Sequence, residues 1–375
     1  MENRAIVESD WQAVLNMMPM DLEDSARAKL ALRRRREIRC ASDLLRLALA
    51  YGLCDFSLRQ TAAWAALTGL GSLSDSAVLK RLQHADKWLG YLILRWLQDR
   101  GLTTSVPGLW VRIVDATGVS EPGSKGTDWR VHLGLDLAQQ RLATVELGGP
   151  QEGETLRRHD FSPGETVLAD RGYSQRSGVA KVLEEGGHLV VRLNWQNFPL
   201  ETREGEPLDI VRCLETLDQG EIGDWDVQFR VDGRIYSVRL VAVRKTEAAA
   251  AAEQKRIRQG KRSKGRQPHP QALRAAHFVF VITDWDRETL PAVEALELYR
   301  LRWQIEMAFK RMKSLLHLDH LRAKDPALAR TYLYAKILGA LIVDELCGEA
   351  LAFFPWGFPF FPQARQPLAR LPSGR

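Results

Sequence analysis

Three acidic residues occur where a carboxylate could take part in chemistry. Asp115 interrupts an apolar segment, IVDATGV, where a lone acid is costly unless it is paired or bound to a metal ion. Asp170 closes the segment TVLADRGY at the end of a predicted strand, a common position for a site, and Glu306 lies in a predicted helix. Three carboxylates form an oxygen cage that suits magnesium. Two such ions about 3.5–4 Å apart activate an attacking hydroxyl group and stabilise a leaving oxygen.

The helix that carries Glu306, predicted over residues 289–318, places a polar row on one face. At roughly 100° per residue, offsets of 0, 3, 7 and 14 fall within about 60° of arc. The residues at these offsets are Tyr299, Arg302, Glu306 and Lys313. An adjacent face is apolar, so the helix is expected to pack by one side. Arg302 and Glu306 are also spaced i,i+4, and intrahelical charge pairing alone would explain that pair.

Segments rich in β-branched residues predict the strands that position these acids. The predicted strands cover residues 109–120, 129–137, 141–148, 166–173, 188–195 and 277–284, with a hairpin over 225–231 and 235–245. Helices are predicted over residues 175–185, 289–318 and 331–352. This order predicts an α/β fold of the ribonuclease-H-like type, with helices on the faces of a sheet. The predicted catalytic core covers residues 106–350 and contains an insertion at about 197–276.

Residues 1–105 are predicted to form a helical DNA-binding region. A helix over residues 58–67, a break at 68–73 and a second helix from Ser74 to Trp88 resemble a helix-turn-helix. Lys80, Arg81 and Lys87 of the second helix are the candidates for DNA contact. An ordinary helical bundle would explain the same pattern.

The charge of the 375-residue chain favours an anionic partner. Its net charge is +6 and its pI about 9.2, as expected for a protein that neutralises phosphates. Residues 33–36 are all basic, and residues 255–266 carry seven Lys or Arg and no acid, although a solvated surface would explain either run. Between 248 and 270 the sequence predicts either a helix ending in a flexible loop or a disordered segment.

Several other classes of function lack support. The four cysteines form no CxxC pair, so neither a zinc site nor a disulfide framework is predicted, and a reducing cytoplasm is the expected compartment. No apolar run of 18 residues predicts a membrane span, and the N-terminus shows no secretory signal. No phosphate loop, nucleophile elbow or Cys/His signature supports ATP use or a hydrolase with a Ser or Cys nucleophile.

The polar row and the two aspartate segments together resemble a known family. The row Tyr299-x2-Arg302-x3-Glu306-x6-Lys313 matches the YREK signature of the insertion-sequence-four family of DDE transposases. VDATG around Asp115 and LADRGY around Asp170 resemble the first and second aspartate motifs of that family. The resemblance covers about residues 30 to 350.

This resemblance implies an activity, a cofactor and partners. It implies a ribonuclease-H-like core with a β-rich insertion before Glu306, in which Asp115, Asp170 and Glu306 hold two Mg²⁺ ions, with Mn²⁺ as a substitute. It further implies cut-and-paste transposition by a homodimer that binds terminal inverted repeats and target DNA. A water would cut the end, the freed 3′-hydroxyl would form a hairpin that is reopened, and the 3′-ends would attack the target. The expected location is the bacterial cytoplasm, at the nucleoid, without a membrane.

Other residues receive roles from their chemistry and from the family. Arg302 and Lys313 are expected to contact phosphates near the cleaved end. Tyr299 is expected to hydrogen-bond a phosphate or to stack near the terminal base. Related enzymes stack an aromatic residue of the insertion on a flipped base, and Phe278, with Trp285 as the alternative, lies at a matching distance from Glu306. Of the two interpretations of Phe278, a core residue of a strand is the one that we favour.

Two further expectations concern Arg171 and the end of the chain. Arg171, next to Asp170, is predicted to touch DNA or to pair with an acid. Residues 351–375 are rich in Pro and aromatic residues and are predicted to form an irregular tail where the family continues with helix. The alternatives are therefore an inactive or truncated copy that acts as a DNA-binding regulator, and a structure-selective nuclease that cuts without joining.

Overall fold

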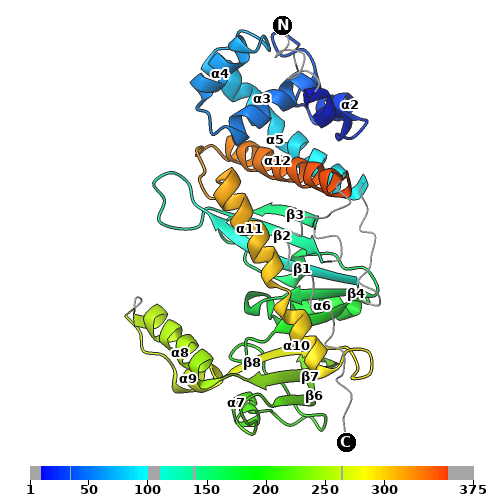
Figure 1. Ribbon diagram of the computed structural model, residues 1–375, viewed down its shortest axis with the longest axis vertical. Helices are drawn as coiled ribbons and strands as arrows, with labels where there is room; N and C mark the ends of the chain where they lie inside the picture. Colours follow the sequence, from blue (N-terminus) through cyan, green and yellow to red (C-terminus); the bar gives the residue numbers. More distant parts are fainter. Residues whose placement is uncertain (1–9, 34, 100–109, 138–140, 263–264, 354–375) are drawn as a thin grey trace, which may run out of the picture.

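A mixed sheet of eight strands lies at the centre of the computed structural model, which describes residues 10–33, 35–99, 110–137, 141–262 and 265–353 (Figure 1). Its strand order is β3-β2-β1-β4-β5-β8-β7-β6. The strands are β1 Trp110–Val119, β2 Trp129–Asp136, β3 Arg141–Gly148, β4 Glu165–Ala169, β5 His188–Arg192, β6 Ile222–Val231, β7 Arg234–Arg244 and β8 Phe278–Thr283. Every strand predicted from the sequence is present, and the α/β class is confirmed.

Strands β1, β4 and β5 are parallel neighbours, and their register matters for the site. Val114 of β1 pairs with Ala169 of β4, and Ala169 pairs with Val191 of β5. The residues that follow, Asp115, Asp170 and Arg192, therefore form one row across the sheet. Because side chains alternate between the two faces of a strand, three residues in one row of parallel strands point to the same face.

Helices α10 (Ala292–Arg300) and α11 (Trp303–Leu316) cross this face of the sheet (Figure 1). The prediction of one continuous helix over residues 289–318 is wrong, because the chain makes a tight turn at residues 301–302. The amide of Leu301 donates to Leu298 at 3.0 Å and that of Arg302 donates to Tyr299 at 3.1 Å, both three residues back instead of four. Helix α10 packs over β5 to β8, and α11 packs over β1 and β2, so each helix follows a different part of the twisted sheet.

Helices α2 (Leu22–Ala28), α3 (Ala41–Leu53), α4 (Leu58–Leu67) and α5 (Asp75–Asp99) form a layer at one end of the molecule (Figure 1). Local signals set their starts, since Ser57 forms a capping box with Gln60, and the Ser74 hydroxyl accepts from the amide of Ala77 at 3.2 Å. The predicted break at residues 68–73 is present. Helix α5 continues eleven residues beyond the predicted end at Trp88.

Helix α12 (Pro326–Phe353) returns to this layer from the other end of the chain and packs against α3 and α5. Gly52 of α3 faces Ala335 so closely that a Cβ at residue 52 would lie 2.6 Å from the Ala335 Cβ, which explains the glycine. Helix α12 is long and apolar enough to cross a membrane, but 72% of that stretch is buried inside the protein, as in a core helix. The predicted domain limit at residue 105 and the tail beyond residue 353 lie outside the described residues.

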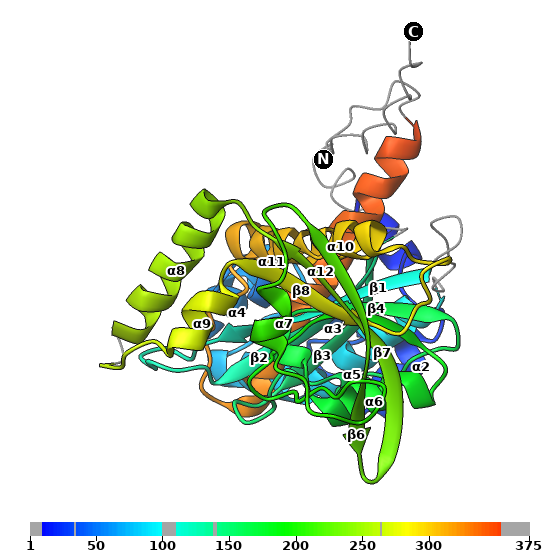
Figure 2. The same cartoon turned by 90° about the horizontal axis from the view of Figure 1, so that it is seen from below.

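The predicted insertion extends the sheet and adds three helices, which are α7 (Ile210–Leu214), α8 (Glu247–Arg262) and α9 (Pro270–Ala275). Strands β6 and β7 form the predicted hairpin, and β8 joins it to β5. The alanine-rich segment is a helix, α8. Figures 1 and 2 both show α8 and α9 standing out from one side of the molecule. On the other face of the sheet, α6 (Arg176–Glu184) covers part of a second apolar core.

Candidate active site

Asp115 and Asp170 lie side by side because of the parallel register of β1 and β4. Asp115 is the sixth residue of β1, and its side chain is 18% exposed. Its Oδ1 accepts from the amide of Ala116 at 2.8 Å. Asp170 follows the last residue of β4 and precedes a short 3-10 helix, η2 (Arg171–Tyr173). Two carboxylates of one row thus face the helices α10 and α11.

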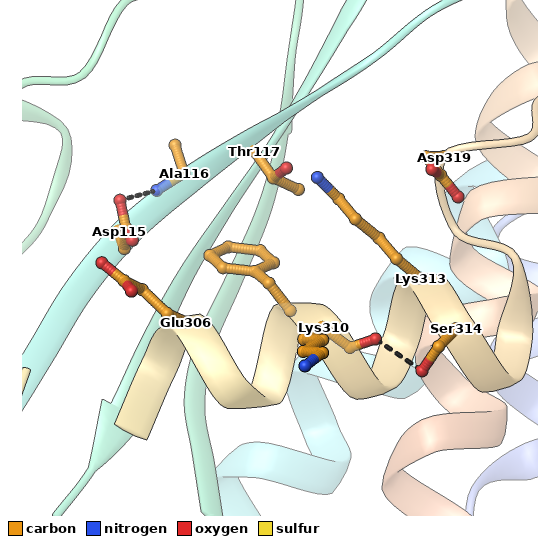
Figure 3. Close-up of a pocket in the computed structure, with 9 residues that line it drawn as sticks. Asp115, Ala116, Thr117, Glu306, Lys310, Lys313, Ser314 and Asp319 are labelled. Atoms are coloured by element: carbon orange, nitrogen blue, oxygen red, sulfur yellow. Dashed lines mark hydrogen bonds between the residues drawn. The ribbon is translucent and has the colours of Figure 1, made fainter. Parts of the chain in front are cut away.

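Helix α11 brings Glu306 to this pair. Asp115 and Glu306 line the same open pocket of about 490 Å³, together with Thr117, Lys310, Lys313, Ser314 and Asp319, among others. Figure 3 shows the Glu306 carboxylate reaching toward Asp115, while Lys313 extends toward Thr117. Two of the three predicted acids therefore share a cavity, and the third adjoins it through the sheet.

The guanidinium of Arg302 lies among the three acids. Its Nη1 is 3.6 Å from Asp115 Oδ2, and its Nη2 donates to Glu306. Burial lowers the pKa of Arg302, but the neighbouring Tyr299, Glu306 and Asp170 outweigh burial and hold it above its ordinary value. The i,i+4 pair of Arg302 and Glu306 expected from helical spacing is therefore present. Arg302 also contacts Asp115 of β1.

The two aspartates differ in electrostatic environment. Burial raises the pKa of Asp115 from 3.8 to about 6, against the Ala116 amide and Arg302, which lower it. Burial also raises the pKa of Asp170, but the Arg171 amide, Arg302, Arg192 and the Tyr299 hydroxyl outweigh it, so the net pKa is below the ordinary value. Of the two aspartates, Asp115 is therefore the one whose environment disfavours its charge when no further cation is bound.

The donor set fits a hard divalent cation by its chemistry. It consists of carboxylate oxygens, and the raised pKa of Asp115 marks a buried acid that lacks full compensation by positive charge. Within the described part of the chain, no three His, Cys, Asp or Glu side chains are grouped closely enough to hold an ion. The Arg302 contacts occupy Asp115 and Glu306 instead.

The other predicted site residues lie in different surroundings from one another. Tyr299 is 8% exposed, and its hydroxyl donates to Asp170 Oδ1 at 3.1 Å instead of facing solvent. Lys313 lines the pocket, and Arg171 is exposed next to Asp170. Phe278 is 3% exposed in the second core, so in this structure it is a core residue and not a free stacking surface.

The remaining sequence candidates lie away from the acids. The alternative aromatic, Trp285, stacks on His188 with ring centroids 3.6 Å apart. In the helical layer, Lys80 and Lys87 of α5 are exposed, and Arg81 is partly buried. Their role in DNA binding stays a prediction.

Two residues near the acids were not predicted. Arg192 ends β5, and its Nη1 is 3.9 Å from Asp170 Oδ1. The sequence could have predicted this contact, because one predicted strand ends near Asp170 and the next contains Arg192. Glu154 lies in an irregular loop, where no periodicity marks it. A Cβ at Gly172 would lie 1.8 Å from its carboxylate, and Glu154 contributes to raising the pKa of Asp115.

The sequence of the chain is similar to a protein-family model and to several known proteins. Residues 106–342 match the family model described as "Transposase DDE domain". The chain is 38% identical over 355 residues to the putative transposase InsL for insertion sequence element IS186A of Escherichia coli (strain K12), covering 92% of this chain and 96% of that protein. It is also 38% identical over 356 residues to the transposase for insertion sequence element IS421 of Escherichia coli, with the same coverage. A transposase for insertion sequence element IS231F of Bacillus thuringiensis subsp. israelensis is 25% identical over 266 residues, 63% of this chain and 56% of that protein.

Proposed function

Since the chain belongs to the DDE transposase family and is a transposase of the insertion-sequence-four type, we propose that it cuts DNA at the ends of an insertion sequence and joins them to target DNA. The observation that carries the proposal is the position of Asp115, which lies beside Asp170 in the sheet and opposite Glu306 across a pocket. Parallel register sets the first two side by side, and a pocket joins the first to the third. Hydrolysis and strand joining are both phosphoryl transfers, so one site of this kind serves every step.

The order of the first five strands supports a ribonuclease-H-like core. Strands β1 to β3 form an antiparallel meander, and β4 and β5 add to β1 in parallel. On this proposal, residues 106–350 form the catalytic core and residues 1–105 the DNA-binding region. The segment from about 197 to 276 is then the insertion.

The three carboxylates are proposed to hold two Mg²⁺ ions, for which Mn²⁺ substitutes. When bound, the ions supply Lewis acidity and lower the pKa of a coordinated water. The protein's own groups orient the reactants. The Tyr299 hydroxyl fixes the rotamer of Asp170, and Ala116 fixes that of Asp115. Arg302 contacts both Asp115 and Glu306. It therefore lies close enough to donate hydrogen bonds to a phosphate oxygen bound beside these acids.

Lys313 and Arg171 are proposed to bind phosphates on opposite sides of the cut. Lys313 lines the pocket on the side of the helical layer, and Arg171 is exposed on the side of Arg192. The helical layer, with Lys80 and Arg81, is proposed to bind the terminal inverted repeat. Phe278 would serve as a stacking residue only if β8 opened at its start. We further propose a homodimer acting on paired ends, in the bacterial cytoplasm at the nucleoid.

The proposal is tested by incubating the purified protein and its Asp115→Ala variant with labelled DNA carrying the end of its own element, with and without Mg²⁺ or Mn²⁺. Cleavage at the end that requires both the metal and Asp115 supports the proposal, and transfer of the cut 3′-end to a second duplex supports the joining step. Cutting without joining identifies a nuclease. Binding without cleavage by either protein identifies an inactive copy that acts as a regulator.

A further inference from the structure

We propose that helix α8 and the cations between it and Asp170 form a phosphate-binding track for the DNA that flanks the element. The flanking DNA is the duplex beyond the cut, outside the insertion sequence. This inference rests on the proposed function and assigns a partner to a surface that the catalytic proposal does not use. The basic track consists of Arg192, Arg171 and Lys245 near the sheet and Lys255, Arg256, Arg258, Lys261 and Arg262 on α8.

The track begins at the row of the active site. The row that starts with Asp115 and Asp170 continues directly into Arg192, so the sign of the charge changes from negative to positive across three neighbouring strands. Arg171 is exposed beside Asp170. A phosphate held by the acids through metal ions would therefore have its next neighbours in the strand near cations on this side.

Lys245 and Arg256 connect the sheet to α8. Lys245 follows β7, and its Nζ donates to the carbonyl of Ala276 at 3.0 Å, so the ammonium is held and not free to move away. Burial lowers the pKa of Lys245, Glu253 raises it, and the cations Arg192, Arg256 and Arg171 lower it further. Arg171 likewise has Arg192 and Arg256 among its charged neighbours. These four cations thus lie near one another, with Glu253 among them, and repel each other unless an anion binds.

Helix α8 is anchored by its first half and carries its cations on its second half. Ala250 is buried, and the Gln254 side chain donates to the carbonyl of Leu273 at 2.9 Å. Beyond that point every cation of the helix is exposed. Arg256 pairs with Glu253 at 2.9 Å. For the other four, Lys255, Arg258, Lys261 and Arg262, the described residues provide no ion-pair partner.

The dimensions of this half-helix fit a DNA strand. Residues 255–262 span about 10 Å at 1.5 Å per residue. One strand of a duplex carries a phosphate every ~3.4 Å along its axis, so the segment covers about three phosphates. Because α8 stands out from one side of the molecule in both views, a duplex can approach it without meeting the sheet (Figures 1 and 2).

The position of the track selects flanking DNA over the DNA of the element itself. Helix α11 leads from Glu306 through Lys313 toward the helical layer, which packs against α12 at the opposite end of the molecule from the insertion (Figure 1). If that layer binds the terminal repeat, the chain places the duplex on the other side of the scissile phosphate over Arg192, Lys245 and α8.

The experiment measures duplex binding in EDTA, so that no cleavage is needed for the readout. The wild type is compared with the variant K255Q/R258Q/K261Q/R262Q on two labelled duplexes. One duplex carries the element end with 20 base pairs of flanking DNA, and the other stops at the cleavage position. Affinity is measured between 50 and 200 mM salt. The matched control, R258K/R262K, keeps the charge of the helix.

The variant is expected to bind the flanked duplex at least tenfold more weakly. The slope of log K against log salt is expected to fall by up to about 2.7, which is 0.9 for each of the roughly three phosphates that the segment covers. The control should keep the slope of the wild type, and all three proteins should bind the unflanked duplex equally. All four substituted side chains are exposed, so an unchanged urea midpoint should accompany the loss.

Three outcomes would overturn the inference. The first is a variant whose salt slope on the flanked duplex equals that of the wild type. The second is a variant that loses equal affinity for both duplexes, and the third is a variant that loses affinity for the unflanked duplex alone. If the wild type binds the flanked duplex in EDTA and cuts it after Mg²⁺ is added, while the variant binds it equally well, only the inference about α8 fails. If the wild type binds neither duplex, the proposed function itself fails, and the inference fails with it.

Discussion

Replacing Asp115 with asparagine is expected to stabilise the metal-free protein while abolishing metal-dependent cleavage. Burial raises the pKa of this carboxyl from 3.8 to about 6, so folding at neutral pH forces a charge into an environment that disfavours it. A shift of one pKa unit corresponds to 1.36 kcal/mol, and a shift of about two units therefore costs on the order of 3 kcal/mol. Asparagine has nearly the same shape, and its side-chain oxygen can accept the hydrogen bond that the Ala116 amide donates to Asp115 at 2.8 Å.

The sign of the effect fixes its pH dependence. Between about pH 4 and pH 6 the folded protein binds more protons at Asp115 than the unfolded chain does, so stability falls as pH rises through this range. The cost is absent below the unfolded pKa and complete above the folded one. Linkage gives an advantage of the variant of roughly 1.5 kcal/mol at pH 5 and about 3 kcal/mol at pH 8.

The assay is urea unfolding in EDTA at pH 5 and pH 8, followed by the fluorescence of the eleven tryptophans. Glu306→Gln is the control, because the Glu306 side chain is 55% exposed and its replacement should change stability by less than about 0.5 kcal/mol. Adding Mg²⁺ at pH 8 should stabilise the wild type and not the Asp115→Asn variant. A variant less stable than the wild type at pH 8, or an advantage that does not grow from pH 5 to pH 8, would refute the reasoning.

Three further substitutions test separate parts of the structure. Tyr299→Phe removes one hydrogen bond, to Asp170, and should cost about 1 kcal/mol of stability and slow single-turnover cleavage while leaving the affinity for end DNA unchanged; a normal cleavage rate would contradict the role of Tyr299. Lys313→Ala should change the free energy of unfolding by less than about 0.5 kcal/mol but reduce the salt slope of DNA binding by about one, and an unchanged slope would count against a phosphate contact. Asp55→Ala leaves the Lys336 ammonium, whose side chain is 0% exposed, without its ion-pair partner at 2.8 Å, and should cost about 3 kcal/mol in urea unfolding. The double change Asp55→Ala with Lys336→Met should recover part of that loss, and no recovery would argue against an uncompensated charge as the cause.

Local sequence signals predicted the elements well, because each depends on a few neighbouring residues. Ser74 marks the start of α5, and β-branched residues mark the strands. The turn at residues 301–302 was not predictable in this way. It contains neither Gly nor Pro, and the apolar periodicity continues through it. The turn arises from packing, since α10 and α11 lie over different strands.

The candidate site was predictable in its acids but not in its contacts. Asp115, Asp170 and Glu306 follow from residue type and motif spacing, whereas the bond from Tyr299 to Asp170 joins residues 129 positions apart. The spacing instead suggested that Tyr299 faces DNA beside Arg302. The nearness of Glu154 to Asp115 and Asp170 arises from a loop without regular structure, so only the folded chain reveals it.

The packing of α12 into the helical layer has a consequence for how the protein is synthesised. Asp55 accepts from Tyr332 and Lys336, which follow it by 277 and 281 residues. A ribosome that adds 5–20 residues per second needs roughly 14–56 s to make the intervening chain. Throughout that time α3 and α5 lack the helix that covers their apolar sides. A chain interrupted before α12 therefore presents an incomplete N-terminal layer to proteases and chaperones, and the layer is completed only after the whole catalytic region has emerged.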